Sequence, residues 1–148
     1  MIDNGTSNAF NGIIDDLRIY NSAVPFVPVS ITTVTGSLSY VPGVVGLNAA
    51  NFVNTPGGSA TNYIRGACSP GANFSASLWF NLQSYPDISS NSTKIMTLGS
   101  TADGNFSIDV TSAGALRIMT YRTGGISDTY TVSTISINTW YHLSLIHI

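Results

Sequence analysis

Residues 73–83 read N-F-S-A-S-L-W-F-N-L-Q, and this stretch decides the fold of the chain. Its apolar residues occupy every second position, namely Phe74, Ala76, Leu78, Phe80 and Leu82. Successive side chains of a β-strand point to opposite faces, so an extended chain places all five on one face. A helix would scatter them around its circumference and leave no apolar stripe to bury. The stretch is therefore predicted to be a central strand of a half-buried sheet.

The composition favours one domain with a sparsely charged surface. The 148 residues are 43% hydrophobic, which suffices for a core, and only 8% are charged. Ser, Thr, Asn and Gly take the surface positions instead, so we interpret the chain as extracellular, cell-surface or virion-associated. The net charge of -2 and the scattered Lys and Arg argue against binding of nucleic acid. No apolar run reaches membrane-spanning length, so membrane insertion is not expected.

Further alternating stretches predict more short strands along the chain. They centre on Ile95 and Met96, on Ile108, on Ile118 and on residues 129–133. Residues 31–40, I-T-T-V-T-G-S-L-S-Y, predict a strand pair around Gly36. Turn residues separate these segments and no helical period occurs. The sequence thus predicts an all-β, antiparallel β-sandwich.

The first recognisable segment, residues 10–24, reads F-N-G-I-I-D-D-L-R-I-Y-N-S-A-V. It resembles the closing phrase F-x-G-x-I-D-D-V-R-I-Y-N-x-A-L of laminin-G-like domains in the concanavalin A-like lectin/glucanase superfamily. From Gly43, G-V-V-G-L-N-A-A-N-F resembles an opening phrase of such domains. F-S-A-S-L-W-F at residues 74–80 resembles the family's F-T-I-S-A-W-F, and Trp140-Tyr141-His142 resembles its W-Y-H strand. The resemblance implies a concanavalin A-like jelly roll, here incomplete.

The closing phrase precedes the opening phrase, which inverts the order within one domain. We interpret residues 1–24 as the closing strand of a preceding laminin-G-like repeat and residues 25–30 as a linker. Residues 31–142 are then the N-terminal two thirds of the next domain. Tandem repeats explain this order more simply than circular permutation does. As a hypothesis, the strand at residues 10–20 pairs into the second domain and fills the slot of its missing last strand.

The final residues, 143–148, read L-S-L-I-H-I. One frame of the transposase end sequence used in common sequencing libraries translates to these residues. We therefore expect them to be a sequencing-adapter translation, with the natural sequence ending near His142. The competing interpretation is a genuine strand that continues from Trp140, because these residues also have β character.

Catalytic chemistry is poorly supported by the residues present. Glucanases of the superfamily need a pair of carboxylates flanking the glycosidic bond, and the chain contains no Glu. Regular alternation would place Asp16 and Arg18 on one face with Ile14 and Tyr20, where we interpret them as a structural pair at a strand end. His142 is interpreted as structural, and the lone Cys68 as a passive loop thiol. We expect no enzymatic activity.

Two kinds of ligand site remain candidates. Trp79 interrupts the polar face of the predicted central strand and either stacks on a sugar ring or packs under a loop. Laminin-G-like domains often hold calcium at a rim through oxygen ligands, which implies a candidate set at Asp87, Asn91, Asp103 and Asn105. These four are otherwise ordinary turn residues, and none has the spacing of a dedicated calcium loop. Calcium is the one cofactor that the resemblance implies.

We therefore expect a non-catalytic recognition or adhesion module of a larger protein. Its partners would be a glycan or a protein surface, together with neighbouring repeats of the same chain. Two alternatives stay open: a structural spacer repeat of a cell-surface or virion fibre, and an accessory domain of a glycoside-active enzyme.

Overall fold

The computed structural model describes residues 10–20, 30–55, 61–67, 74–87, 92–98, 105–121 and 127–147. The helices and strands of these residues are all β-strands, with no helix among them, which confirms the predicted all-β class. None of the described residues belongs to a helix long and apolar enough to span a membrane. The strands are β1 Gly12–Tyr20, β2 Ser30–Thr35, β3 Ser39–Val41, β4 Ala49–Phe52, β5 Tyr63–Ala67, β6 Phe74–Leu82, β7 Ser92–Leu98, β8 Asn105–Thr111, β9 Ala115–Tyr121, β10 Ser127–Thr134 and β11 Trp140–His147.

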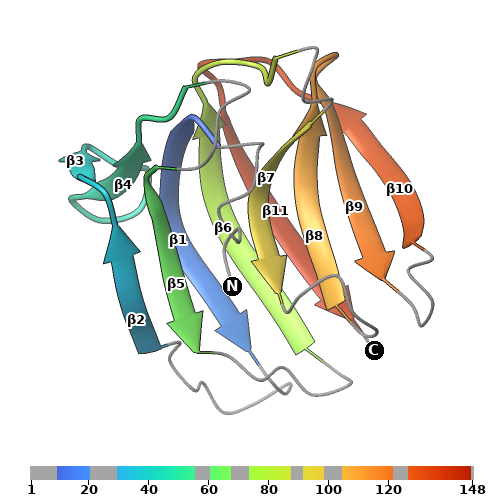
Figure 1. Ribbon diagram of the computed structural model, residues 1–148, viewed down its shortest axis with the longest axis horizontal. Coiled ribbons are helices and arrows are strands. Elements are labelled where there is room, and N and C mark those ends of the chain that lie inside the picture. Colours follow the sequence, from blue (N-terminus) through green and yellow to red (C-terminus); the bar gives the residue numbers. More distant parts are fainter. Residues whose placement is uncertain are drawn as a thin grey trace.

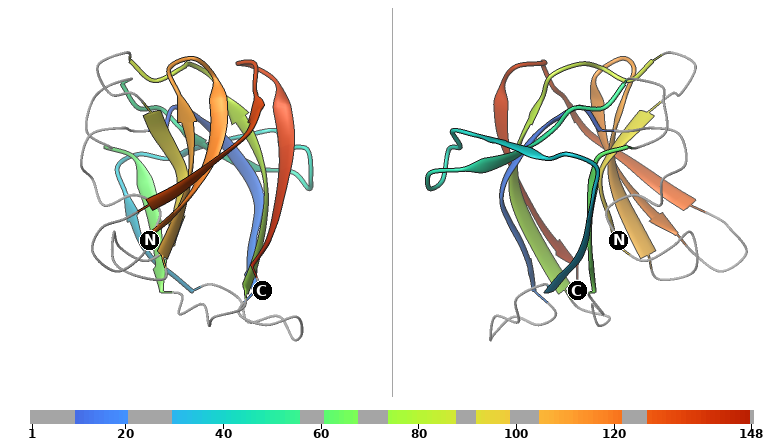
Figure 2. Two further views of the ribbon diagram at one scale, coloured as in Figure 1. Left: turned by 90° about the vertical axis from the view of Figure 1, so that its right-hand side faces the viewer. Right: turned by 60° about the vertical axis from the view of Figure 1, so that its left-hand side comes forward.

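The strands form two facing layers with antiparallel pairing throughout (Figures 1 and 2). One layer is a five-stranded sheet in the order β11-β6-β1-β4-β3. The other contains a four-stranded sheet in the order β10-β9-β8-β7, and the two-stranded ribbon β2-β5 lies on that same side (Figure 2). This is the predicted antiparallel sandwich.

Strand β6 has the alternation that the sequence predicts. Its five alternate apolar residues are each at most 6% exposed and form the centre of the core. The ring of Phe74 stacks on Phe106 of β8 with centroids 4.9 Å apart, which joins the two layers. Burial of each large side chain contributes about 1.5–3 kcal/mol. Strand β6 lies inside the sheet, between β11 and β1, which agrees with the prediction of a central strand.

Strand β1 lies between β6 and β4, so the hypothesis that this segment pairs into the sheet is confirmed. Ile14 lies opposite Phe80 and Ile19 opposite Ala76, and both isoleucines are buried in the core. Most of the proposed linker lies outside the described residues. Whether β1 comes from a preceding repeat stays a prediction.

The prediction of regular alternation along β1 is wrong. The pairing with β6 shifts register between Asp15 and Arg18, and Asp16 has a φ of 47°. This β-bulge inserts an extra residue, so Ile14 and Ile19 face the core together although their spacing is odd. Arg18 faces outward and its Nε donates to Asp16 Oδ1 at 2.8 Å. The expected structural pair is therefore present, but it lies at a bulge within β1 and not at the strand end that the sequence predicted.

The two strands predicted on either side of Gly36 are present, but they do not pair with each other. β2 pairs with β5, whereas β3 pairs with β4 in the other layer. Gly36 has a φ of 78°, and a Cβ there would collide with Thr61 O and the side chain of Asn62. Glycine therefore lets the chain pass closely beside that segment and change sheets.

Strand β11 runs from Trp140 to His147 and pairs with β6 over its whole length. Leu143 is buried at 8% exposure, whereas Ile146 is 72% exposed. Residues 143–147 thus extend the strand, as the competing interpretation of this segment requires. Their origin from adapter DNA stays a prediction, because strand pairing does not reveal how the codons arose.

Candidate functional site

The outward face of the four-stranded sheet carries polar side chains from neighbouring strands that are joined by described contacts. The registers of β7 to β10 align its residues in rows across the sheet. We call this surface the polar face. Its members are Lys94, Thr97, Ser107, Asp109, Arg117, Met119, Tyr121, Thr129 and Thr131.

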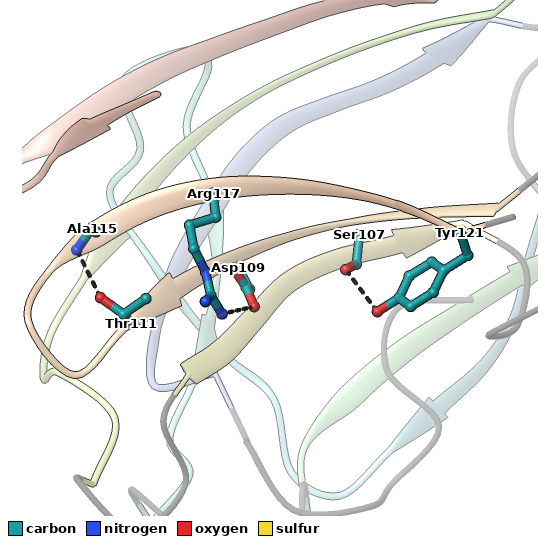
Figure 3. A network of polar contacts seen from close by, with 6 residues as sticks. All are labelled: Ser107, Asp109, Thr111, Ala115, Arg117 and Tyr121. Carbon is teal, nitrogen blue, oxygen red and sulfur yellow. Dashed lines mark hydrogen bonds and ion pairs between the residues drawn. The ribbon is translucent and has the colours of Figure 1, made fainter. Parts of the chain in front are cut away.

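An ion pair lies at the centre of the polar face (Figure 3). The Arg117 side chain reaches from β9 to β8, where its Nε donates to Asp109 Oδ1 at 2.9 Å and its Nη2 donates to Oδ2 at 2.7 Å. The side chain of Asp109 is only 2% exposed, and that of Arg117 is 25% exposed. Both carboxylate oxygens are therefore engaged by one planar guanidinium group, a geometry of high directional specificity.

Electrostatics reinforce this contact. The hydrogen bond from Arg117 to Asp109 and the attraction between their charges raise the pKa of the guanidinium above its ordinary value, although partial burial opposes the shift. The arginine consequently stays charged at every physiological pH. Asp109 is held beside a permanent cation.

Hydroxyl groups continue the polar face along the same strands. Ser107 is fully buried, and its Oγ lies 3.4 Å from the hydroxyl of Tyr121, either of which can donate (Figure 3). Thr97 lies opposite Ser107 on β7 and is 7% exposed. Its Oγ1 is buried without a hydrogen-bond partner. A buried hydroxyl without a partner is unusual and costs about 1–3 kcal/mol.

The turn between β8 and β9 sets the register of this site. Gly114 has a φ of 79° and donates its N–H to Thr111 O at 2.9 Å, while Ala115 N–H donates to Thr111 Oγ1 at 3.0 Å (Figure 3). This tight turn places Asp109 directly opposite Arg117. A shift by one residue would send one member of the pair into the core.

The predicted ligand residue Trp79 lies on the outward face of the other sheet. Its ring is half-buried and packs on His142 of β11, with centroids 4.9 Å apart and a tilt of 41°. His142 Nε2 lies 3.2 Å from Ser77 Oγ. Trp79 is therefore separated from the polar face by the thickness of the sandwich, and its role in ligand binding stays a prediction.

The predicted calcium ligands are only partly described. Asp87 is exposed and follows Tyr85, whose hydroxyl donates to Ile135 O beside the β8–β9 turn. Asn105 begins β8 at the opposite end of that strand. Asn91 and Asp103 lie outside the described residues. No group of three His, Cys, Asp or Glu residues is placed to hold a metal in the described part of the chain.

The polar face was not predicted from the sequence. Ser107 and Asp109 alternate with buried apolar residues of β8, and Arg117 and Tyr121 do so in β9. That alternation places each of them outward, yet it does not reveal which residues lie opposite one another. A short turn at Ala113-Gly114 is the one signal that could have suggested the pairing of Asp109 with Arg117.

Comparison with known proteins places most of this architecture in one family. The laminin-G-like family model described as "Concanavalin A-like lectin/glucanases superfamily" matches residues 55–147, which is more than half of the chain. The matched region includes the four strands that carry the polar face. Searches of curated proteins and of solved structures return no match.

Proposed function

This chain belongs to the concanavalin A-like lectin/glucanases superfamily, and on that premise we propose that it is a non-catalytic recognition module that binds carbohydrate or protein through the polar face. We place it on an extracellular, cell-surface or virion-associated protein, where repeated copies would combine weak individual contacts into useful avidity.

One observation carries this proposal: polar side chains on the outside of the sandwich are buried. Asp109, Ser107 and Thr97 are 1%, 0% and 7% exposed although they point away from the core. Arg117 and Tyr121 form hydrogen bonds with this layer and fix its arrangement. The buried layer holds the partly exposed guanidinium of Arg117 and the half-buried ring of Tyr121 in place, and these two groups suit a saccharide, which offers hydroxyls and an apolar ring face.

The same geometry argues against glycoside hydrolysis. Hydrolysis requires two carboxyl groups that flank the scissile bond. Asp109 is the one carboxylate among the described residues of the polar face, and Arg117 engages both of its oxygens. We therefore propose a binding function without turnover.

A glycan array probed with multivalently displayed chain tests the proposal. We expect binding of the native sequence and at least a tenfold weaker signal for Tyr121→Ala, which removes the aromatic ring from the polar face. The matched control is Tyr130→Ala, because Tyr130 is 59% exposed and points to the opposite face of the same sheet. Equal losses in both variants would contradict the proposal.

The alternatives give different outcomes in the same experiment. A spacer repeat would leave the array silent and would bind no protein partner. An accessory domain of a glycoside-active enzyme would bind the substrate of a neighbouring catalytic domain. Repeating the array with calcium and with a chelator tests the proposal that oxygen ligands near Asp87 or Asn105 support a rim site, since removal of the ion would then abolish the signal.

A further inference from the structure

One row across the four-stranded sheet brings together two cations and one anion. Lys94 of β7, Asp109 of β8 and Arg117 of β9 occupy directly opposed positions in the register. The described residues of the polar face carry no other charged side chain. This row therefore has a net positive charge in a chain whose net charge is -2.

Among the described residues, the ammonium group of Lys94 has no partner. Lys94 lies directly opposite Asp109, yet no hydrogen bond or ion pair joins it to any described residue. Both oxygens of Asp109 already accept from Arg117, so the carboxylate is satisfied without the lysine. Lys94 is a half-buried residue, and its ammonium group lies beside a neutralised carboxylate without a partner in the described part of the chain, so it is suited to accept an external anion.

Two further donors belong to the same face as Lys94. Arg117 uses its Nε and Nη2 on Asp109, which leaves Nη1 of a 25% exposed side chain for a ligand. The unpartnered hydroxyl of Thr97 lies on the same face of β7, separated from Lys94 by a bulge. The side chains of Met119 and Tyr121 continue the same face and offer apolar contact to a sugar ring.

We propose that the polar face selects anionic saccharides, with the Lys94 ammonium and the free side of the Arg117 guanidinium binding a carboxylate or sulfate group of the sugar. The proposal rests on the recognition function proposed above and specifies its ligand class. Carboxylate and sulfate groups share the same recognition chemistry, because each is an oxyanion that accepts charge-assisted hydrogen bonds.

Three oligosaccharide probes test the proposal by calorimetry with the full chain. They are an oligogalacturonide, which carries carboxylates, a sulfated galactan oligosaccharide, and the unsubstituted galactan oligosaccharide of equal length. We expect at least one anionic probe to bind about tenfold more tightly than the neutral probe. Which of the two does so identifies the oxyanion.

Lys94→Gln is the critical variant, and Arg18→Gln is its matched control. Each removes one positive charge, but Arg18 lies on the outward face of the other sheet. We expect Lys94→Gln to reduce affinity for the anionic probe about tenfold and so to remove most of the difference in affinity between the anionic and the neutral probe. Arg18→Gln should alter neither, which excludes a general effect of net charge.

Two outcomes would overturn the inference and separate it from the recognition function. Neutral and anionic probes that bind equally to the native chain and to Lys94→Gln would refute anion selection while leaving recognition intact. Failure of every saccharide and protein probe to bind would refute both proposals.

Thr97→Val gives an independent readout. Valine preserves the shape of the side chain and removes a buried hydroxyl without a partner, so the stability of the unliganded chain should hold or rise. If the hydroxyl contacts the ligand, affinity for the anionic probe nevertheless falls several-fold. Unchanged affinity for that probe would remove Thr97 from the proposed site.

Discussion

The two sheets each carry one outward-facing ion pair of aspartate and arginine. The two pairs differ more in side-chain burial than in the distance between nitrogen and oxygen. Arg18 and Asp16 approach to 2.8 Å with side-chain exposures of 49% and 25%. Arg117 and Asp109 approach to 2.7 Å with exposures of 25% and 2%. The first pair closes a bulge within one strand, whereas the second joins two strands.

This difference shows that distance alone does not define the role of an ion pair. Water screens the exposed pair, so its contribution to stability is about 0–1 kcal/mol. Asp109 is shielded from water and depends on Arg117 for its partner, because a buried charge without compensation is strongly unfavourable. The polar face is consequently fixed in one arrangement, while the pair at the bulge is free to exchange with solvent.

The largest expected effect follows from removing the buried partner. Arg117→Leu should lower the free energy of unfolding by about 3 kcal/mol, because it leaves the Asp109 carboxylate unpaired. Arg18→Leu on the other sheet should lower it by less than about 1 kcal/mol. Urea denaturation of both variants measures the contrast, and equal losses would show that burial does not distinguish the pairs.

A double variant sharpens the same comparison. Adding Asp109→Leu to Arg117→Leu removes the unpaired charge, so we expect most of the lost stability to return. If the double variant is as unstable as Arg117→Leu, packing of the arginine and not its charge stabilises this face.

A smaller effect is expected at Trp79. Trp79→Ala removes a half-buried ring that packs on His142 and should lower the free energy of unfolding by about 2 kcal/mol, less than the loss at a fully buried aromatic residue. Affinity of the polar face for its ligand should not change, since Trp79 lies on the other sheet. Loss of saccharide binding with unchanged stability would instead support the prediction that Trp79 is a ligand residue.

The sequence predicts some of these features and not others, for physical reasons. The alternation of β6 is visible because one strand supplies all five buried residues. The bulge at Asp16 is hidden, since its backbone conformation depends on pairing with β6. The contact between Asp109 and Arg117 depends on the register of two strands, and the burial of Ser107 depends on neighbours from β9. Local patterns therefore predict the core and the fold class, whereas the outward site requires the assembled sheet.

The smallest effect expected at the buried pair comes from a substitution that keeps the charge of Arg117 but not its planar guanidinium. Arg117→Lys keeps the cation but loses the two parallel hydrogen bonds, so we expect a loss of about 1 kcal/mol at neutral pH. Asp109 raises the pKa of Arg117, so the stabilisation is fully present below the unfolded-state pKa and lost only as pH rises through the higher folded-state value. The ordinary pKa of arginine already lies far above neutrality. The native pair should therefore give no pH dependence from Arg117 between about pH 6 and 9.

In Arg117→Lys the loss of stabilisation with rising pH falls within a measurable pH range, because the ordinary pKa of lysine is about 10.4. The same sign applies: Asp109 raises the pKa of the substituted amine, and its stabilisation disappears as pH rises through the folded-state value. The difference in unfolding free energy between the native chain and Arg117→Lys should thus be constant to about pH 9 and widen above about pH 10. Comparing the two proteins at each pH cancels the pH-dependent contributions that they share. A constant difference across this range would mean that the residue at position 117 stabilises the polar face by packing and not by its charge.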